Sequence, residues 1–319
     1  MTSYYLEAAT KETLELSTSI VDTWERFVDP AFEGISSDEL AMFVIGRGHL
    51  TGESQLMRET GSGKAVGFLG LLGDSNRKKF WTQVAVLPDS GLMNEAVTQT
   101  IAKALSIEKN WNLQPNINDL DHQQISAWNS WGFEKIQTSY AMNIENLSPE
   151  RNQYPLLPDN AAIRPLRYES DWKSMHQINL DAFDGHFGFV PLPFSDFKAF
   201  RVDTDNFDPD GIHILSVNGS DIGYVEVTNE ISHINKGYVH TIGLLHSEHK
   251  KGYGKILLKW AFAYCAAKGF EGAELYVDIA NKSGALQFYQ GCGMKPISAY
   301  GTYENLNWNK ITISKNPES

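Results

Sequence analysis

The stretch GLLHSEHKKGYGKILL, residues 243–258, decides how the second half of the chain is interpreted. It begins as the end of an apolar strand, passes through a polar turn with two glycines one residue apart, and continues as the start of an apolar helix. The first amides of a helix have no partner within it, and its dipole favours negative charge there. Glycines leave such backbone open to a ligand. The stretch therefore predicts an anion site, with Lys250, Lys251 and Lys255 adding positive charge, although a plain tight turn stays open as an alternative.

Two common phosphate-binding loops do not fit this turn. A P-loop places Ser or Thr after its Gly-Lys to hold Mg²⁺, and here Ile256 follows Lys255. A dinucleotide-binding loop has a third glycine three residues after the second, where this chain has Leu257. Neither a nucleotide with Mg²⁺ nor a dinucleotide is therefore expected.

The same stretch resembles the signature of the Gcn5-related N-acetyltransferases (GNAT), whose basic-x-x-Gly-x-Gly loop holds the pyrophosphate of coenzyme A. His249 stands where that family usually has Arg or Gln, and His246 where it often has Pro. A second stretch, ELYVDIANKSGALQFYQGCGM at residues 274–294, resembles the family's next strand and helix. The two signatures lie at compatible spacing, and the resemblance covers residues 161–313.

The resemblance implies acyl transfer from acetyl-CoA to an amine, by direct attack through a tetrahedral intermediate and without a metal. It implies that Tyr289 gives a proton to the leaving thiolate, and that the backbone of Ile242, Gly243 and Leu244 stabilises the oxyanion. The remaining residues that the resemblance assigns to coenzyme binding come from the loop and the second signature: His249, Lys250, Lys251, Gly252, Tyr253, Gly254, Lys255, Asn281, Ala285 and Tyr289.

Two side chains are candidates for the group that takes the proton from the attacking nitrogen. Alternation along a strand is expected to place Tyr238, His240 and Ile242 on one face. His240 suits a proton acceptor near neutral pH, and Glu226 on the preceding strand is the second candidate. Either could instead be a polar group in a hydrated site.

The two halves of the chain repeat one order of predicted elements. Each has a hairpin, a strand ending in VAVLP (residues 84–88) or IGLLH (residues 242–246), a long helix, a short helix and a closing strand. We therefore expect an α/β (α+β) fold of two tandem GNAT-like domains, each a mixed, mostly antiparallel twisted sheet flanked by helices. The predicted domains are residues 1–147 and 161–319, joined by a proline-containing linker at 148–160.

The first half lacks the phosphate loop. Its QVAVLPDSGLMNEAV, residues 83–97, keeps the strand and turn, but only Gly91 of the glycines, and Asp89 and Glu95 would repel a phosphate. We expect residues 1–147 to bind coenzyme A weakly or not at all and to close one side of the substrate cleft. Four tryptophans of this half are expected in its core: Trp81, Trp111, Trp128 and Trp131.

The pattern of the first half also indicates a helix over residues 10–30 and a strand at FVIGRG, residues 43–48. In the second half, VNGSD at residues 217–221 predicts the turn of a hairpin.

Composition restricts the partners. The net charge of −12 argues against duplex nucleic acid, which is bound by Lys and Arg. Two cysteines, Cys265 and Cys292, are too few for a disulfide framework and fit a reducing cytosol. No stretch approaches the ~20 apolar residues that cross a bilayer, and the start does not resemble a secretory signal. We expect a cytoplasmic protein without a membrane partner, and the oligomeric state stays open.

The tandem arrangement and DAFDGHFGFVP, residues 181–191, resemble the mycothiol synthase-like branch of the family. That branch has a glutamate about where Tyr238 stands, so its substrate is not carried over. The expected partner is a small-molecule amine. Two other interpretations stay open: a non-catalytic acyl-CoA-binding regulatory protein, and a protein or peptide N-acetyltransferase.

Overall fold

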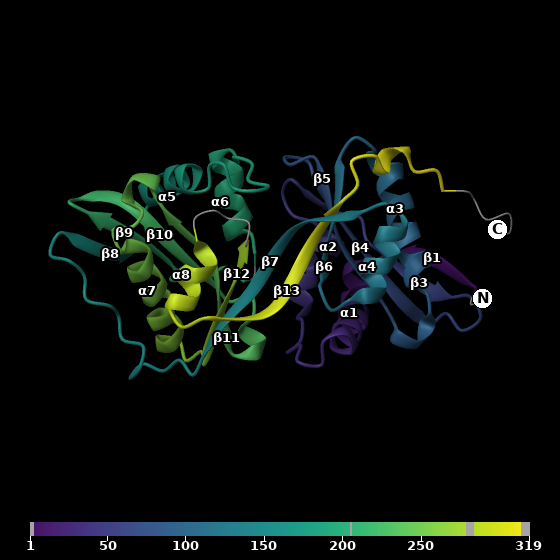
Figure 1. Cartoon of the computed structure of the whole chain (residues 1–319), viewed down its shortest axis with the longest axis horizontal. Helices are drawn as coiled ribbons and strands as arrows, with labels where there is room; N and C mark the ends of the chain where they lie inside the picture. Colours follow the sequence, from purple (N-terminus) through teal and green to yellow (C-terminus); the bar gives the residue numbers. More distant parts are fainter. Residues whose placement is uncertain (1–2, 205, 279–283, 314–319) are drawn as a thin grey trace. The chain divides into compact units, whose positions relative to one another are not determined.

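The computed structural model describes residues 3–204, 206–278 and 284–313, and the chain divides into two compact units. Unit 1 comprises the described residues of 1–138 and 299–319, and unit 2 those of 139–298. Each unit has a mixed, mostly antiparallel sheet with helices beside it (Figure 1), which confirms the predicted fold class.

The sheet of unit 1 has the strand order β1-β3-β4-β5-β6-β13, with β2 paired to β4. All its pairs are antiparallel except β5 with β6. Its strands are β1 (Tyr4–Ala8), β2 (Leu50–Gly52), β3 (Gln55–Glu59), β4 (Ala65–Asp74), β5 (Lys79–Val86), β6 (Asn112–Asn118) and the end of β13 (Lys295–Glu304). Its helices are α1 (Leu14–Val28), α2 (Ser37–Ile45), α3 (Met93–Ile107) and α4 (His122–Ser130), with short 3₁₀ turns η1 (Lys11–Thr13), η2 (Pro88–Ser90) and η5 (Trp308–Lys310).

Unit 2 has the strand order β7-β12-β11-β10-β9-β8, in which only β11 and β12 are parallel. Its strands are the end of β7 (Glu134–Glu145), β8 (Ala161–Pro165), β9 (Ile212–Val217), β10 (Ser220–Thr228), β11 (Lys236–Leu244) and β12 (Gly272–Asp278). Its helices are α5 (Glu169–Ala182), α6 (Phe194–Val202), α7 (Tyr253–Ala267) and α8 (Ala285–Gly291), with 3₁₀ turns η3 (Ser232–Ile234) and η4 (His246–Glu248). The predicted hairpin is confirmed as β9–β10, with its turn at Asn218 and Gly219.

Alternate residues of the unit 2 strands face two different helix layers. Leu215 and Val225 belong to the apolar cluster of α7, which continues through Leu257 and Leu258. Ile212, Ile214 and Tyr224 belong to the cluster of α5 and α6, which continues through Trp172, Met175 and Phe197. The sheet therefore lies between α7 on one face and α5 with α6 on the other.

The closing strands of the two halves are exchanged. Residues 139–145 of β7 pair with β12, so the first half of the sequence supplies the edge of the unit 2 sheet. Residues 300–302 of β13 pair with β6, so the end of the chain completes the unit 1 sheet. The predicted boundaries therefore differ from the units, because residues 139–147 belong to unit 2 and the described residues from 299 onward belong to unit 1.

Two local predictions of the sequence have different outcomes. The strand expected at residues 43–48 was wrong, because Phe43–Ile45 are the last residues of α2. That helix begins at a capping box, in which Ser36 and Glu39 exchange hydrogen bonds. Between β7 and β8, the described residues 146–160 contain no helix or strand, as expected of a linker, although they lie in unit 2.

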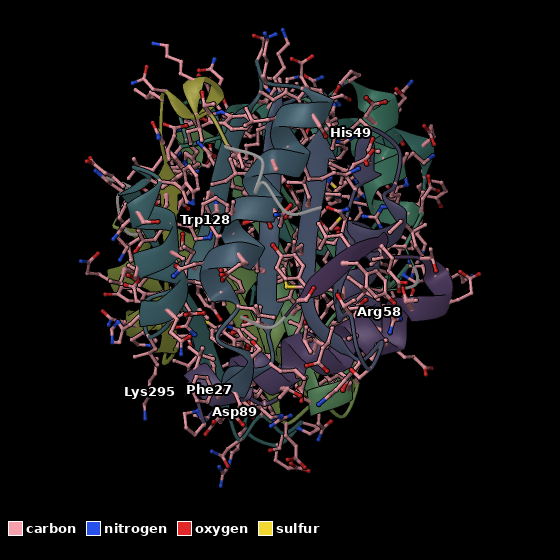
Figure 2. All side chains as sticks on the ribbon, turned by 90° about the vertical axis from the view of Figure 1, so that its right-hand side faces the viewer. Phe27, His49, Arg58, Asp89, Trp128 and Lys295 are labelled. Atoms are coloured by element: carbon pink, nitrogen blue, oxygen red, sulfur yellow. The ribbon has the colours of Figure 1, made fainter. Side chains whose placement is uncertain are left out.

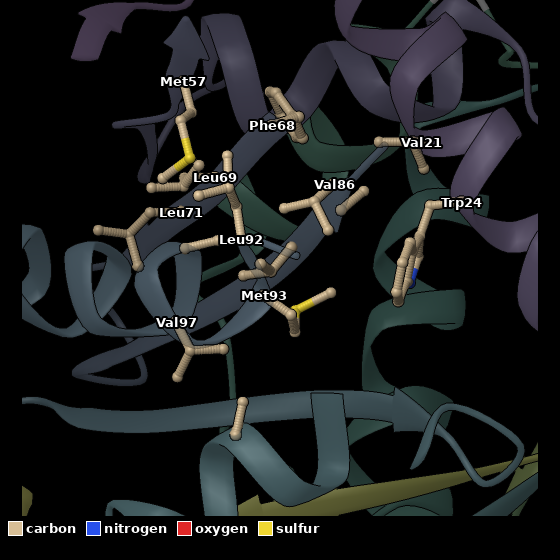
Figure 3. Packing of buried hydrophobic residues seen from close by; sticks show 14 of the residues in the cluster. Val21, Trp24, Met57, Phe68, Leu69, Leu71, Val86, Leu92, Met93 and Val97 are labelled. Atoms are coloured by element: carbon tan, nitrogen blue, oxygen red, sulfur yellow. The ribbon is translucent and has the colours of Figure 1, made fainter. Parts of the chain in front are cut away.

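The core of unit 1 is built between its sheet and its helices. Side chains of β4, β5, α1 and α3 meet in one apolar cluster, in which Trp24, Phe68 and Val97 are fully buried (Figure 3). Trp128 is also fully buried in this cluster, and Trp111 and Trp131 pack against it, as predicted. Trp81 is not among the residues of this cluster. Its ring lies 3.4 Å from the ammonium of Lys79. Within the described ranges, the helices are all too short or too polar to cross a membrane.

The exchanged C-terminal segment is predicted to stabilise unit 1. Trp308 is 3% exposed, and its Nε1 donates to the Trp111 carbonyl at 3.0 Å. We expect Trp308→Ala to lower the free energy of unfolding of unit 1 by about 3–5 kcal/mol, measured by denaturant titration. Leu306→Ala, at a side chain that is 81% exposed, is the matched control and should change it by less than about 0.5 kcal/mol. Equal effects of the two variants would contradict a core role for this segment.

Candidate active site

The parallel strands β11 and β12 pair only at their beginnings. Lys236, Gly237 and Tyr238 pair with Gly272, Ala273 and Glu274. Both strands then continue, to Leu244 and Asp278, without further pairs between the described residues. Backbone hydrogen-bonding groups of β11 beyond Tyr238 are therefore left along the edge that faces β12. This parting of β11 and β12 is the centre of the candidate site.

A β-bulge in β11 lies directly beside the parting. Glu226 of β10 pairs with Thr241, whereas the next residue, Val227, pairs with Val239, so His240 is the extra residue of the bulge. The bulge changes the expected alternation. Tyr238 and His240 share a face, with ring centroids 6.1 Å apart, but Ile242 packs with the α7 cluster on the other face. The prediction that all three share one face was therefore wrong for Ile242.

The bulge brings His240 against a buried carboxylate. Nδ1 of His240 lies 3.3 Å from Oε2 of Glu226 and 2.9 Å from Oγ1 of Thr241. The same carboxylate oxygen accepts from Nε of Arg201 on α6 at 3.0 Å, and Glu226 is 2% exposed. Burial by itself would raise the pKa of Glu226, but Arg201 and His240 beside the carboxylate lower it to about 2. Both candidate proton acceptors therefore lie together, and Glu226 is a permanent carboxylate in an ion pair.

Arg201 is the residue of this group that the sequence analysis missed. Its guanidinium also donates to the Phe197 carbonyl at 3.1 Å and lies 3.8 Å from the Phe197 ring centroid. Arg201 and Phe197 are both buried residues of α6. An arginine one turn after a phenylalanine on the apolar face of a helix was the available signal, because a buried guanidinium needs a carboxylate.

The predicted anion site is a turn of open backbone at the start of α7. Lys250 and Gly252 both have left-handed φ values, 62° and 91°, on either side of Lys251. In the described part of the chain, none of the amides of residues 250–254 donates a hydrogen bond to another protein group. A β-carbon at Gly252 would meet no atom within 4 Å, so the backbone there is open. Such a concave run of amides at a helix start is suited to an anion.

The basic side chains of this turn contribute unequally to its positive charge. His249, at the position usually held by Arg or Gln, turns back and donates from Nε2 to the Leu244 carbonyl at 3.0 Å. The ammonium of Lys251 lies 3.0 Å from a carboxylate oxygen of Glu248, which offsets part of its charge. His246 ties the turn to α5, because its amide donates to Asp181 at 2.7 Å.

Tyr289 lies on α8, on the α7 side of the sheet. Its ring packs with the α7 cluster and lies 5.1 Å from the ring of Phe288. Burial raises the pKa of Tyr289 to about 12, so its hydroxyl stays protonated at neutral pH. Within the residues that the structure describes, this hydroxyl has no hydrogen-bond partner. Ala285 begins α8 and packs with the same cluster, whereas Asn281 lies outside the described residues.

The corresponding turn of unit 1 carries apolar and acidic side chains and no lysine. Leu92 and Met93, at the start of α3, are 5% and 4% exposed and point into the core (Figure 3). The amide of Leu92 donates to Oγ of Ser90 at 3.3 Å, and Asp89 is exposed in η2 (Figure 2). The pairing of β5 with β6 nevertheless ends early, at Thr82 and Pro115. Unit 1 therefore keeps the parting of its parallel strands, but its turn lacks the lysines that would attract an anion.

Comparison with known proteins agrees with this geometry. Residues 172–294 match the acetyltransferase (GNAT) family model. A stretch of 92 residues is 34% identical to an uncharacterised N-acetyltransferase of Methanocaldococcus jannaschii and spans 28% of this chain, but only 40% of that relative. The match identifies residues 172–294, within the second half of the chain, as a GNAT-family domain.

Solved structures show that the whole chain has a tandem GNAT fold. A GCN5-related N-acetyltransferase from Sphaerobacter thermophilus superposes with a TM-score of 0.77 at 17% identity, covering 95% of both chains. A tandem GNAT protein from the clavulanic acid biosynthesis pathway superposes with a TM-score of 0.74 at 12% identity, covering 95% of this chain and 98% of the other. At 17% and 12% sequence identity, these similarities establish a shared fold and nothing further.

The open turn gives a testable prediction for coenzyme binding. Gly252→Asp adds bulk and negative charge where phosphate is expected, and should weaken acetyl-CoA binding at least roughly tenfold in calorimetric titration. Gly269→Asp is the matched control, since Gly269 has nearly the same φ, 89°, and open surroundings at the other end of α7. The control should keep the affinity of the unaltered chain. Equal loss in both variants would mean that backbone strain, and not the anion site, is responsible.

Proposed function

We propose that the chain is an acyl-CoA-dependent N-acetyltransferase that moves an acetyl group from acetyl-CoA to the primary amine of a small molecule. The observation that carries the proposal is the early end of the β11–β12 pairing, followed in the chain by the open amides of residues 250–254. An acyl thioester with a phosphorylated end fits this sequence of features. The phosphates would lie at the turn, and the extended arm would lie along the free edge of β11.

The parting of the strands would allow chemistry from both faces of the sheet. His240 lies on the face covered by α6, and Tyr289 lies on the face covered by α7. In this proposal, His240 takes a proton from the attacking nitrogen as the N–C bond forms, and Tyr289 donates a proton to the sulfur as the C–S bond breaks. Those backbone amides of residues 242–244 that point to the free edge of β11 would hydrogen-bond the carbonyl oxygen as it gains charge.

We assign the proton acceptor to His240 and a positioning role to Glu226. A carboxylate whose pKa is about 2 and which already accepts from Arg201 is a poor base. It is instead suited to orienting the imidazole, since it lies beside Nδ1 and leaves Nε2 for the amine. The two side chains then act as one unit.

Direct transfer is favoured over a route through a thiol. Burial raises the pKa of Cys265 to about 12 and also raises the pKa of Cys292, so both remain thiols at neutral pH. A thiol is a far weaker nucleophile than a thiolate. We therefore expect the acetyl group to pass to the amine while both substrates are bound.

The test of the proposed function uses the full chain. Acetyl-CoA binding is measured by calorimetry, and turnover is measured as thiol released in the presence of a panel of small amines. Binding with amine-dependent thiol release supports the proposal. Binding without turnover on any amine would favour an acyl-CoA-binding regulatory protein, and turnover only on peptide amines would favour a protein N-acetyltransferase. Absence of acetyl-CoA binding by the folded chain would refute all three.

Tyr289→Phe is predicted to slow turnover without weakening coenzyme binding. Loss of a proton donor should lower kcat by roughly 10²-fold, while acetyl-CoA affinity measured by calorimetry stays within about twofold. Because the pKa of Tyr289 is about 12, the ratio of unaltered to variant rates should be constant between about pH 7 and pH 10. Parallel losses of kcat and affinity would make Tyr289 a structural residue.

His240→Ala is predicted to lower kcat by roughly 10²–10⁴-fold, since it removes the proton acceptor. Glu226→Gln should lower kcat less, by roughly tenfold or more, because the imidazole loses the carboxylate beside Nδ1. The decisive measurement is the double variant. If Glu226 acts through His240, then Glu226→Gln has almost no further effect on kcat in the His240→Ala chain. Additive losses would show that Glu226 has another role.

A further inference from the structure

The face of the unit 2 sheet that carries His240 also carries a row of aromatic rings. The ring of Phe200 on α6 lies 6.4 Å from that of His240, His240 lies 6.1 Å from Tyr238, and Tyr238 lies 6.3 Å from Tyr276 on β12. We call Phe200, His240, Tyr238 and Tyr276 the aromatic row. The row continues from α6 across β11 to β12, beside the point where the two strands part.

The aromatic row lies on the side of the sheet away from the α7 core. Along β12, Ala273, Leu275 and Val277 are buried in the α7 cluster, so Tyr276 between them points to the other face. Tyr276 is 50% exposed, although it lies in the middle of a strand that is paired on its other edge with β7. An exposed ring at the centre of a sheet, next to a proposed catalytic histidine, is a surface for a substrate.

Two ion pairs lie on this face of the sheet. Glu226 accepts from Arg201, and Lys236 donates to Glu274 at 2.7 Å. A polyamine would need carboxylates for its second and third ammonium groups, and an amino sugar would need several polar side chains for its hydroxyls. The ring faces offer neither, but they contact a flat apolar group well. An approaching ammonium group is also attracted to tyrosine rings before it loses its proton.

We propose that the acceptor is an aralkylamine, whose aromatic body lies on Tyr238 and Tyr276 and whose amino group reaches His240. This inference rests on the proposed function. It makes Tyr276 a specificity-determining residue and assigns it no part in the acetyl transfer itself. The position of Tyr276 one strand away from His240 sets the distance between the ring and the amine of the acceptor.

The test compares three amines at saturating acetyl-CoA: 2-phenylethylamine, spermidine and glucosamine. We expect 2-phenylethylamine to have the highest kcat/KM, by roughly tenfold or more. Tyr276→Ala should lower that value by roughly tenfold, mainly through KM, whereas Tyr276→Phe should retain most of it because the ring remains. Tyr5→Ala, at another half-exposed tyrosine of a strand, is the control and should change nothing.

The outcomes separate this inference from the proposed function. Preference for spermidine or glucosamine would overturn the aralkylamine assignment while leaving the enzyme in place. Equal losses on all three amines in Tyr276→Ala would also overturn it, and Tyr238→Ala provides a second variant if Tyr276→Ala does not fold. Retained acetyl-CoA binding with no turnover on any amine would overturn the proposed function itself, and the inference would fall with it.

Discussion

The short parallel pairing of β11 with β12 is the constraint on which the candidate site depends. A strand in the middle of a sheet that loses its neighbour after three residues exposes backbone groups and gives up packing. Each of the two strands is instead paired along its other edge. β12 pairs over seven residues with β7, and β11 pairs along its length with β10. The parting is therefore held open by the pairing of each strand with its other neighbour.

This dependence gives the exchanged strand a functional meaning. The residues of β7 that support β12 come from the first half of the sequence, before the linker. A chain cut within residues 148–160 would remove this support from unit 2 and would leave β6 without β13. The first half of the sequence therefore contributes to the site of the second half even without binding a ligand of its own.

The buried ion pair of Glu226 and Arg201 is a second feature that costs free energy of folding, and its position beside His240 explains it. Removing two charges from water costs several kcal/mol for each ion, and an apolar pair of the same size often serves stability better. What an apolar pair would not supply is a fixed negative charge beside His240. The β-bulge has the matching effect on the backbone, since it turns His240 toward Glu226 and sends Ile242 to the opposite face. Both features are explained by the placement of one imidazole.

The features predicted from the sequence are those that short segments determine by themselves. The glycine turn, the helix after it and the Asn-Gly hairpin each depend on a few neighbouring residues, and each was found. The strand exchange was not found, because the local pattern of residues 134–145 is the same whichever sheet the strand joins. The error at residues 43–48 had a visible signal, since Ser36 and Glu39 form a capping box before an apolar run. The bulge at His240 had none, because strand alternation is assumed until the register of the neighbouring strand is known.

Unit 1 shows which parts of this arrangement belong to the fold and which belong to the ligand. It keeps the helix order and the early end of the β5–β6 pairing, so these features do not require a bound coenzyme. It differs in the side chains of the turn, because Leu92 and Met93 are buried in the core of unit 1, while the turn of unit 2 carries Lys250, Lys251 and Lys255. Two buried apolar side chains each stabilise a core by about 1.5–3 kcal/mol, whereas lysines that lie close together repel one another. The turn of unit 2 is therefore the one of the two that suits the proposed anion.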